Sequence, residues 1–364
     1  MILNIYIAKR FFRAFLIVLA VFVSILLPID LAEQAGRIAS TQAGFSAALE
    51  LALLNLPGAL YEMMPLFVML ATLLMFLGLA RTSELVVIRA AGRSALRTTM
   101  AAVGAAIALG LIGIMVVNPI VAATQAQYDA SISRFQSGEV RTLSVSEEGL
   151  WLRQGNEERQ TVIRASQANG DGTLLFEASF FTFSREGEMQ QRIEGQQAAL
   201  QDGAWVITGA KIWDLTVANA EAVALSLPEY ILPSTLTPEQ IRDSFGHPST
   251  VPIYELPGFI TQLNNAGFAA LTHRVWLQME LSTPLMLVAM VLIGAGFTMR
   301  HTRFGRTGVM VLTAILLGFG VFFIRSFAQV LGESGQLPVL VVAWAPPLAA
   351  IMLALGLLLH TEDG

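Results

Sequence analysis

The sequence of 364 residues contains no cysteine and few charged side chains. Without cysteine the chain has no disulfide, no thiolate nucleophile and no cysteine-ligated metal. Charged residues make up 13% of the chain and hydrophobic residues 54%, whereas soluble proteins carry about 25% charged residues. The composition therefore predicts a membrane protein with a soluble part.

The chain also has few lysines and no closely spaced histidines, which limits the reactions that it could catalyse. The chain has only two lysines, Lys9 and Lys211, and neither ends a P-loop signature. The chain therefore cannot hydrolyse ATP by the P-loop route on its own. Its four histidines are scattered and include no HExxH pair, which is the usual signature of a zinc protease. The sequence thus predicts a non-catalytic protein without a cofactor of its own.

Six stretches are apolar and long enough to cross a bilayer as helices, which takes about 20 residues. They cover residues 14–31, 57–80, 98–122, 276–297, 308–331 and 339–359. Basic residues gather in the segments that an inward N-terminus would place in the cytoplasm, as the positive-inside rule requires. These are Lys9, Arg10, Arg13, Arg81, Arg89, Arg93, Arg97, Arg300, Arg303 and Arg306. We expect both termini to be cytoplasmic.

The segment between the third and fourth spans, residues 123–271, is polar and acidic. It holds 18 Asp and Glu against nine Lys and Arg. Stretches such as "TLSVSEEGLWLRQG" and "GTLLFEASFFTFSREGE" alternate apolar with polar residues and are separated by turn clusters, a pattern typical of an all-β roll or sandwich. A connector follows, with a helix that starts near Thr237-Pro238 and a stop at Gly267. The expected domains are thus residues 1–122, 123–271 and 272–364.

Several ionisable residues fall at membrane depth, where they are costly and often functional. Asp30 and Glu33 lie at the outer end of the first span, and Arg37 follows. Glu280 in the fourth span and Arg325 in the fifth lie at similar depths, so they could pair or face one cavity. Two interpretations remain open. The groups are an interfacial carboxylate and a snorkelling arginine, or they form a polar lining for an amphiphile with a charged head.

The stretch "ARTSELVVIRAAGRS", residues 80–94, separates the second and third spans. Ser83 is a suitable N-cap, Glu84 suits the first helical turn and Gly92 suits a stop. The spacing predicts a short cytoplasmic helix over about 83–92. Glu84, Ile88 and Ala91 fall on one face of it, with Val87 beside them. From spacing alone it is either a docking helix or a charged turn.

The order of three spans, a β domain and three spans resembles the LptF/LptG family of lipopolysaccharide-export permeases over essentially the whole chain. "LARTSELVVIRAAGRS" is similar to the family's SELV-x-x-x-A-x-G segment, and "EEGLWLRQGN" to the start of its periplasmic β-jellyroll. "LGESGQLPVLVVAWAPPL" is similar to its last loop and sixth span. The Trp-x-Pro of that segment leans towards the LptG branch, with the paralogous LptF branch as the alternative.

The resemblance implies an α-helical membrane protein with six transmembrane helices and an inserted all-β, jellyroll-like periplasmic domain. It would be the permease of an ABC transporter that extracts lipopolysaccharide from the inner membrane of a Gram-negative bacterium. Its implied partners are an LptB-like ATPase dimer that binds the ATP, an LptF-like permease, and LptC-like and LptA-like bridge proteins; no nucleic acid is involved. The family's coupling glutamate corresponds by position to Glu84.

From this resemblance two groups of site residues are expected. The ATPase-coupling residues are Ser83, Glu84, Leu85, Ile88, Arg89 and Gly92. The candidate lipid-cavity residues are Asp30, Glu33, Arg37, Arg274, Glu280 and Arg325. One feature departs from the family, because LptG members can present lysines near the outer end of the first span. Here only arginines could contact lipid phosphates, either Arg37, Arg274 and Arg325 or, with a less phosphorylated lipid, none.

Two other classes of protein stay open at this point. A membrane sensor or scaffold with a ligand-binding outer β domain would need a cytoplasmic output domain, yet only "TEDG" follows His360. A membrane enzyme would need a convergent acid and base cluster near the spans, and the sequence shows none.

Overall fold

The computed structural model describes residues 2–39, 44–137, 144–146, 149–155, 159–169, 172–184, 187–217, 219–234, 236–237, 241, 247–299 and 307–362. Contacts divide the chain into two compact units. The helical unit comprises Met1–Gln136, Ser249–Ile253 and Leu271–Gly364, and the β unit comprises Ser137–Pro248 and Tyr254–Ala270. The predicted basic residues Arg300, Arg303 and Arg306 lie outside the described residues.

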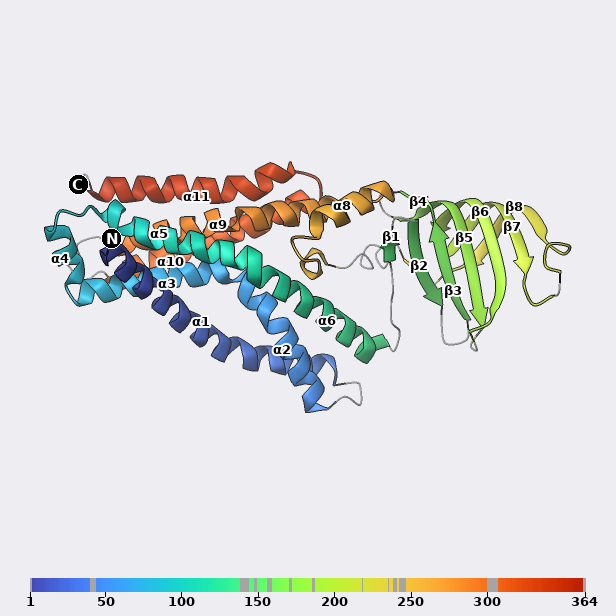
Figure 1. Ribbon diagram of the computed structural model, residues 1–364, viewed down its shortest axis with the longest axis horizontal. Helices are drawn as coiled ribbons and strands as arrows, with labels where there is room; N and C mark the ends of the chain where they lie inside the picture. The colour runs from blue at the N-terminus through green and yellow to red at the C-terminus, as the bar shows by residue number, and fades with distance from the viewer. Residues whose placement is uncertain are drawn as a thin grey trace. The chain divides into compact units, whose positions relative to one another are not determined.

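The helical unit is a bundle of long apolar helices (Figure 1). The helices are α1 (Ile2–Arg37), α2 (Phe45–Glu62), α3 (Met64–Arg81), α4 (Glu84–Ala90), α5 (Ala95–Ile112), α6 (Asn118–Ser137), α9 (Leu271–Thr298), α10 (Thr307–Glu333) and α11 (Val339–Glu362). Among the described residues, six helical segments are long and apolar enough to cross a membrane. The start of α1, the end of α11 and the short helix α4 lie at one end of the bundle.

The second span is shorter than predicted because the helix is interrupted. The prediction began it at Pro57, but α2 contains Pro57 and ends at Glu62, and the apolar span α3 begins at Met64. Pro65 lies in the first turn of α3, where its missing N–H costs nothing, and it cannot continue the hydrogen bonds of α2. The run that the sequence presents as one span is therefore two helices.

The third span is longer than predicted. A π-helical turn, Gly113–Val117, joins α5 to α6, and Asn118-Pro119 follows it directly. Proline has no N–H for the carbonyl four residues earlier, which favours such a widened turn rather than a helix end. The helix then runs on to Ser137. The predicted domain boundary at residue 122 falls inside α6.

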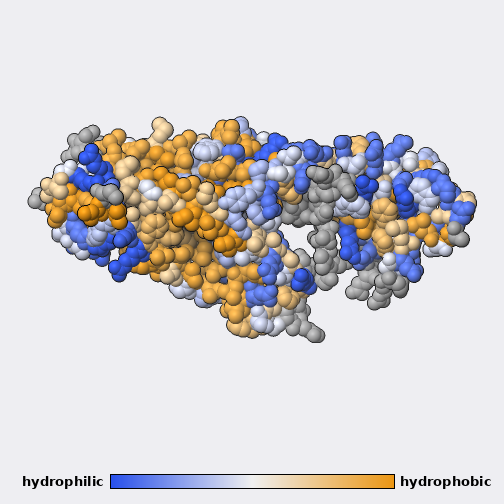
Figure 2. All heavy atoms as spheres, viewed as in Figure 1, coloured by the Kyte–Doolittle hydropathy of each residue, from blue (hydrophilic) through white to orange (hydrophobic). Residues whose placement is uncertain are grey.

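The middle of the bundle is filled by α3 and α9. Buried side chains make up 67% of the apolar window of α3 and 78% of that of α9, but only 17% of those of α1 and α10. Close approach depends on small residues: a Cβ on Gly110 of α5 would lie 2.8 Å from the Cα of Pro284 in α9. Helices α1 and α10 therefore present apolar surface outward, and Figure 2 shows hydrophobic residues across the bundle.

The β unit is one antiparallel sheet with strand order β1-β2-β3-β5-β6-β7-β8, and β4 also pairs with β5. The strands are β1 (Ser144–Ser146), β2 (Gly149–Gly155), β3 (Arg159–Ala165), β4 (Gln167–Ala168), β5 (Leu174–Ser184), β6 (Met189–Gln201), β7 (Ala204–Asp214) and β8 (Leu225–Pro233). Every second residue faces a core that includes Phe180 and Trp205, both fully buried. The indole N–H of Trp205 donates to Gln154 Oε1 at 3.2 Å.

The β unit also contains α8 (Leu256–Asn265), whose buried side chains include Leu256, Ile260 and Leu263. Gly267 has φ +90° directly after this helix, so the predicted stop at Gly267 is confirmed. The predicted helix start at Thr237-Pro238 falls largely outside the described residues. The predicted fold class, a six-span helical protein with an inserted all-β region, is confirmed.

Candidate functional site

The short helix α4 begins with a sharp turn. Ser83 precedes it in the left-handed region with φ 59°, and its side chain makes no capping hydrogen bond. The prediction that the Ser83 side chain caps α4 is therefore wrong. Thr82 takes a local role instead, because its hydroxyl donates to Glu84 Oε1 at 2.9 Å and contacts the carbonyl of Gly78 at 3.1 Å.

The end of α4 agrees with the prediction. Gly92 has φ +78°, its N–H donates to the Arg89 carbonyl at 2.9 Å, and the N–H of Arg93 donates to the Ile88 carbonyl at 3.4 Å. These two bonds are the Schellman pattern that closes a helix with glycine just past its end. The predicted stop at Gly92 is confirmed.

Helix α4 has one face packed against the bundle and another exposed. Leu85 and Ile88 are 7% and 6% exposed, whereas Val86 and Val87 are 57% and 67% exposed. Ala90 is exposed on the same outward face as the two valines. The predicted coupling residues Leu85 and Ile88 thus hold α4 to the bundle. The outward apolar face, Val86, Val87 and Ala90, was missed, although four consecutive apolar residues in "LVVI" cannot all lie on one face of a helix.

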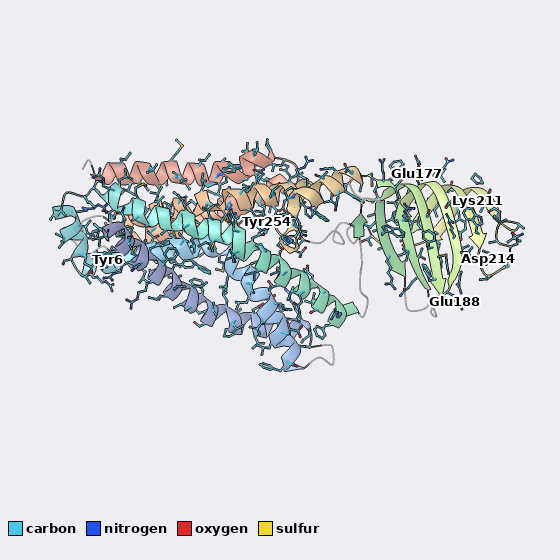
Figure 3. The ribbon with its side chains drawn as sticks, in the orientation of Figure 1. Tyr6, Glu177, Glu188, Lys211, Asp214 and Tyr254 are labelled. Carbon is cyan, nitrogen blue, oxygen red and sulfur yellow. The ribbon has the colours of Figure 1, made fainter. Side chains whose placement is uncertain are left out.

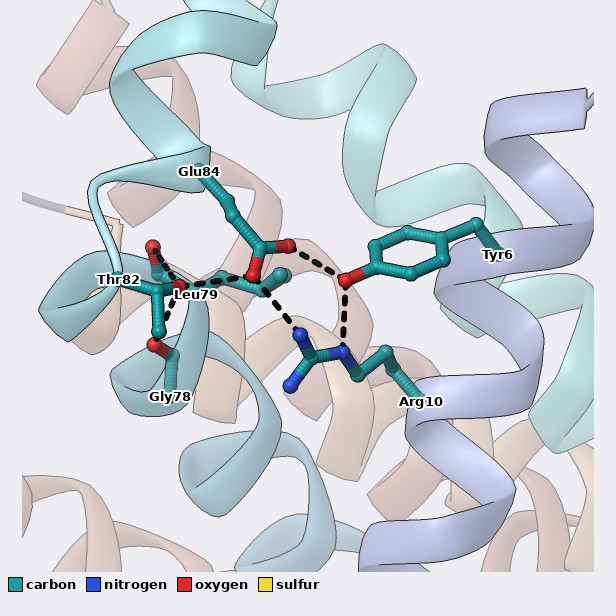
Figure 4. Close-up of polar contacts among 6 residues, drawn as sticks. All are labelled: Tyr6, Arg10, Gly78, Leu79, Thr82 and Glu84. Atoms are coloured by element: carbon teal, nitrogen blue, oxygen red, sulfur yellow. Dashed lines mark hydrogen bonds and ion pairs between the residues drawn. The ribbon is translucent and has the colours of Figure 1, made fainter.

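Glu84 is held by two side chains of α1 and by Thr82 in the turn before α4 (Figure 4). Its Oε2 accepts a 2.6 Å bond from the Tyr6 hydroxyl, and its Oε1 accepts a 2.8 Å bond from Arg10 Nη2. Arg10 Nε donates to the Tyr6 hydroxyl at 2.8 Å, and the guanidinium lies 5.3 Å from the Tyr6 ring centroid. Figure 3 places Tyr6 on α1 beside α4. We call Tyr6, Arg10, Thr82 and Glu84 the Glu84 cluster.

These contacts favour the ionised form of Glu84. Its pKa is lowered from the ordinary value, first by the Tyr6 hydroxyl and then by the Thr82 hydroxyl and the Arg10 guanidinium. The side chains of Arg10 and Glu84 are 37% and 30% exposed, so water still reaches the cluster. Sequence reasoning found Glu84 but not its partners on α1.

A second contact joins α4 to the end of α9. Arg89 Nη2 donates to the Met299 carbonyl at 2.6 Å, a carbonyl just past α9, where a positive charge is favoured by the helix dipole. Arg89, predicted as a coupling residue, therefore binds the chain's own bundle. Together the two contacts link α4 to both α1 and α9.

Glu280 lies deep in the bundle with 4% of its surface exposed. Its Oε2 accepts a 2.5 Å hydrogen bond from the Tyr61 hydroxyl of α2. The side chain of Asn118 in α6 lies close to Glu280, and the charge of Arg325 acts on it. We call Tyr61, Asn118, Glu280 and Arg325 the Glu280 cluster.

Arg325 does not form an ion pair with Glu280 within the described part of the chain. Its Nη2 donates to the Met279 carbonyl and to the Thr283 hydroxyl, each at 3.3 Å. The predicted proximity of Glu280 and Arg325 is thus found as an electrostatic interaction, while the hydrogen bonds of Arg325 go to neighbours of Glu280 on α9. Arg325 tethers α10 to α9.

Asp30, Glu33 and Arg37 belong to a separate cluster formed by α1, α2 and α6. Asp30 Oδ1 accepts bonds from Gln34 at 3.0 Å and Asn55 at 2.9 Å. Arg37 pairs with Glu33 at 2.7 Å and also donates to the Tyr128 hydroxyl at 3.1 Å. We call Asp30, Glu33, Gln34, Arg37, Asn55 and Tyr128 the Asp30 cluster.

The structure therefore does not bring the six predicted cavity residues into one site. Three belong to the Asp30 cluster and two to the Glu280 cluster, while Arg274 is exposed in the first turn of α9. The described residues contain no group of three or more His, Cys, Asp or Glu that could hold a metal ion. These polar groups can join helices or contact charged headgroups, but they do not resemble a catalytic centre.

The surface of the sheet carries a row of cations and aromatic rings. Arg192 of β6 lies 5.8 Å from the Phe181 ring and 5.3 Å from the Trp213 ring, and Lys211 lies 4.7 Å from the Trp213 ring. Glu221 pairs with Lys211 at 2.6 Å. Figure 3 shows Lys211 and Asp214 near each other on β7. This row keeps the outer face of the sheet polar while the opposite face forms the core.

Comparisons with known proteins agree with this architecture. Residues 5–360 match the model of a family described as lipopolysaccharide export system permease LptF/LptG. The chain is 25% identical over 361 residues to the lipopolysaccharide export system permease protein LptG of Escherichia coli strain K12, covering 97% of this chain and 94% of that protein. It is 21% identical over 315 residues to the LptG protein of Haemophilus influenzae, covering 85% of each.

Proposed function

Because the chain belongs to the LptF/LptG family of lipopolysaccharide export permeases, we propose that it is the LptG-type half of a transporter driven by a separate ATPase. As a member of this family it is a multi-pass inner-membrane permease. The relatives that it matches over 97% and 85% of its length are named LptG, which favours that branch over LptF. An LptF-like permease would then be its partner in the membrane.

The observation that carries the proposal is the outward face of α4. Val86 and Val87 are among the most exposed apolar side chains outside the spans, and an exposed apolar patch on a rigid element marks a protein interaction site. The helix is fixed on its other side by Leu85, Ile88, Glu84 and Arg89. A partner that binds the valine face can therefore push on the whole bundle. The ATP-binding subunit, which would be LptB-like, is the partner that this chain needs because it has no P-loop.

The placement of α4 also fits a single orientation of the chain in the membrane. The start of α1, the end of α11 and α4 share one end of the bundle, and the basic residues of the sequence gather in the same segments. If α4 meets a cytoplasmic ATPase, both termini are cytoplasmic and the β unit is periplasmic. The β unit would then deliver lipopolysaccharide to LptC-like and LptA-like bridge proteins.

The lipid would pass between this chain and its permease partner. Exposed apolar side chains recur along one stripe of α10: Val309, Leu312, Leu316, Phe319, Phe323, Phe327 and Val330. A second stripe follows α1, where Ile17, Val21, Ile25 and Ile29 are exposed at intervals of four residues. These stripes suit acyl chains or a second permease, and the arginines of the two membrane clusters, Arg37 and Arg325, suit phosphate groups.

The proposal is tested by the substitution Val87→Asp in the full complex. A charge on the outward face of α4 would be desolvated when the ATPase binds, so co-purification of the ATPase should fall at least about tenfold. Val217→Asp is the matched control, since Val217 is a valine of the β unit with 43% exposure. Equal co-purification of the ATPase with both variants would contradict the docking role of α4.

A further inference from the structure

We propose that Tyr6 and Arg10 are positioning residues that transmit the movement of α4 to the first span, and that Glu84 acts through them. This inference rests on the proposed docking of an ATPase at α4, but it concerns the opposite side of that helix. It assigns Glu84 to the joint between α4 and α1 rather than to direct contact with the ATPase.

The geometry of the Glu84 cluster fixes α4 against α1 in one orientation. Both oxygens of the Glu84 carboxylate are occupied, Oε2 by Tyr6 at 2.6 Å and Oε1 by Arg10 at 2.8 Å and Thr82 at 2.9 Å. The bond from Arg10 Nε to the Tyr6 hydroxyl at 2.8 Å closes a three-membered ring of side chains. Charge-assisted bonds of this kind are the stronger class of hydrogen bond and are directional. Glu84 cannot move without moving Tyr6 and Arg10 or breaking these bonds.

Tyr6 and Arg10 are in turn fixed in the bundle by their neighbours on α1. Ile7 and Phe11, each the next residue along, are fully buried in the core. The two polar residues are four apart and therefore lie on the same face, one turn from each other. A force on Glu84 is thus applied to a part of α1 that cannot rotate freely.

Helix α1 can carry such a movement across the membrane. It is continuous over 36 residues, which at about 1.5 Å per residue is about 54 Å. Its far end bears Asp30, Glu33 and Arg37, whose hydrogen bonds reach α2 and α6. The exposed apolar stripe of α1 lies between the two ends. A shift of α4 would therefore reach both the lipid-facing stripe and the Asp30 cluster.

Direct contact between Glu84 and an ATPase is the competing account. It would need the carboxylate to leave or share three hydrogen bonds, although 70% of the side chain is already covered within this chain (30% exposed). The outward face of α4 is formed instead by Val86, Val87 and Ala90. The two accounts differ in the partner that Glu84 needs. In the proposed account it is Arg10 and Tyr6 of this chain, and in the competing account it is a residue of the ATPase.

The test uses the complete permease–ATPase complex reconstituted in vesicles with lipopolysaccharide. The variants are Tyr6→Phe, Arg10→Gln, Glu84→Gln and the exchanged pair Arg10→Glu with Glu84→Arg. Arg13→Gln is the control, because Arg13 lies on the same helix, is exposed and has no contact with α4 among the described side chains. Three quantities are measured: co-purified ATPase, the rate of ATP hydrolysis and the lipopolysaccharide released per ATP.

All single variants of the cluster should keep the ATPase bound but release about three- to tenfold less lipopolysaccharide per ATP, because each loses a charge-assisted hydrogen bond that is partly exposed. Arg13→Gln should match the unchanged protein. The exchanged pair should recover at least half of the lost release. Tyr6→Phe removes only one hydroxyl, so this variant still tests the inference if a variant that changes a charge fails to fold.

The inference is overturned if Tyr6→Phe and Arg10→Gln release as much lipid per ATP as the unchanged protein while Glu84→Gln does not. Failure of the exchanged pair to recover any release would equally contradict it. The proposed function fails in a different way, when no ATPase co-purifies with the unchanged chain or when Val87→Asp has no effect on co-purification.

Discussion

The Tyr61 hydroxyl donates a 2.5 Å hydrogen bond to Glu280 across 219 residues of sequence. This bond joins α2 to α9 inside the bundle, and the side chain of Asn118 brings α6 close to the same carboxyl. Asn118 Oδ1 accepts from the N–H of Ile253 at 3.0 Å. A carboxyl buried at membrane depth persists only where such donors satisfy it.

Tyr61→Phe should destabilise the helical unit by about 1–3 kcal/mol, because it leaves a buried acceptor without its shortest bond. The measurement is thermal or denaturant unfolding in detergent. Tyr254→Phe is the control, since Tyr254 is 65% exposed and water can bond to any group that its hydroxyl contacts, so the loss of this hydroxyl should cost little. Equal stability of the two variants would show that Tyr61 does not hold Glu280 in solution.

Glycines of α5 should respond in opposite directions to the same substitution. In Gly110→Ala the new Cβ would lie 2.8 Å from the backbone of Pro284, so α5 and α9 must separate, at a cost of about 1–3 kcal/mol. In Gly104→Ala the new Cβ meets nothing within 4 Å, and alanine should stabilise the helix by up to about 1 kcal/mol. Unfolding of both variants in detergent checks the sign of each change.

The spans were predictable because apolar runs of this length have few alternatives, but the interruptions within them were not. Pro57 and Pro65 both occur in the second apolar run. Pro57 is accommodated inside α2, whereas the helix is interrupted just before Pro65. Pro284 likewise lies inside α9 without ending it. Whether a proline ends a helix depends on neighbouring helices that can satisfy the freed carbonyl, and the local sequence does not contain that information.

In the candidate site, too, features set by the local sequence were predictable, whereas contacts between residues far apart in the sequence were not. The stop at Gly92 follows from local backbone preferences and was predicted. The left-handed conformation of Ser83 is rare for serine and was not. The partners of Glu84 are 78 and 74 residues away, so only packing of α1 against α4 could show them. Burial of Leu85 with exposure of Val87 likewise depends on which face meets the bundle.

The joint between α4 and α1 should depend on pH only in acid. The pKa of Glu84 is lowered by its partners, so the joint stabilises the folded state above the ordinary glutamate pKa of about 4.3 and is lost as pH falls through the lowered value. Hydrogen exchange of residues 84–92, compared with a reference helix of the same chain and corrected for intrinsic rates, should be equally slow at pH 7 and pH 5.5 and faster near pH 3. Glu84→Gln should remove this dependence. Loss of protection already at pH 5.5 would contradict the lowered pKa.

A photoreactive residue at position 325 should form a covalent adduct with lipopolysaccharide in the active complex, whereas one at Val217 of the β-unit surface should not. Arg325 is tethered to α9 through Met279 and Thr283, and Ile324, the residue before it, is 58% exposed. A lipid headgroup near Arg325 would thus have an exposed apolar side chain next to it along α10. Thr283→Val tests the tether in a protein that keeps Arg325 and carries the photoreactive residue at position 323 instead. It removes one acceptor of Arg325 and should shift the adduct yield without changing the amount of ATPase bound. Adducts at 217 but not at 325 would place the lipid path away from α10, and the arginine would then serve only to join α10 to α9.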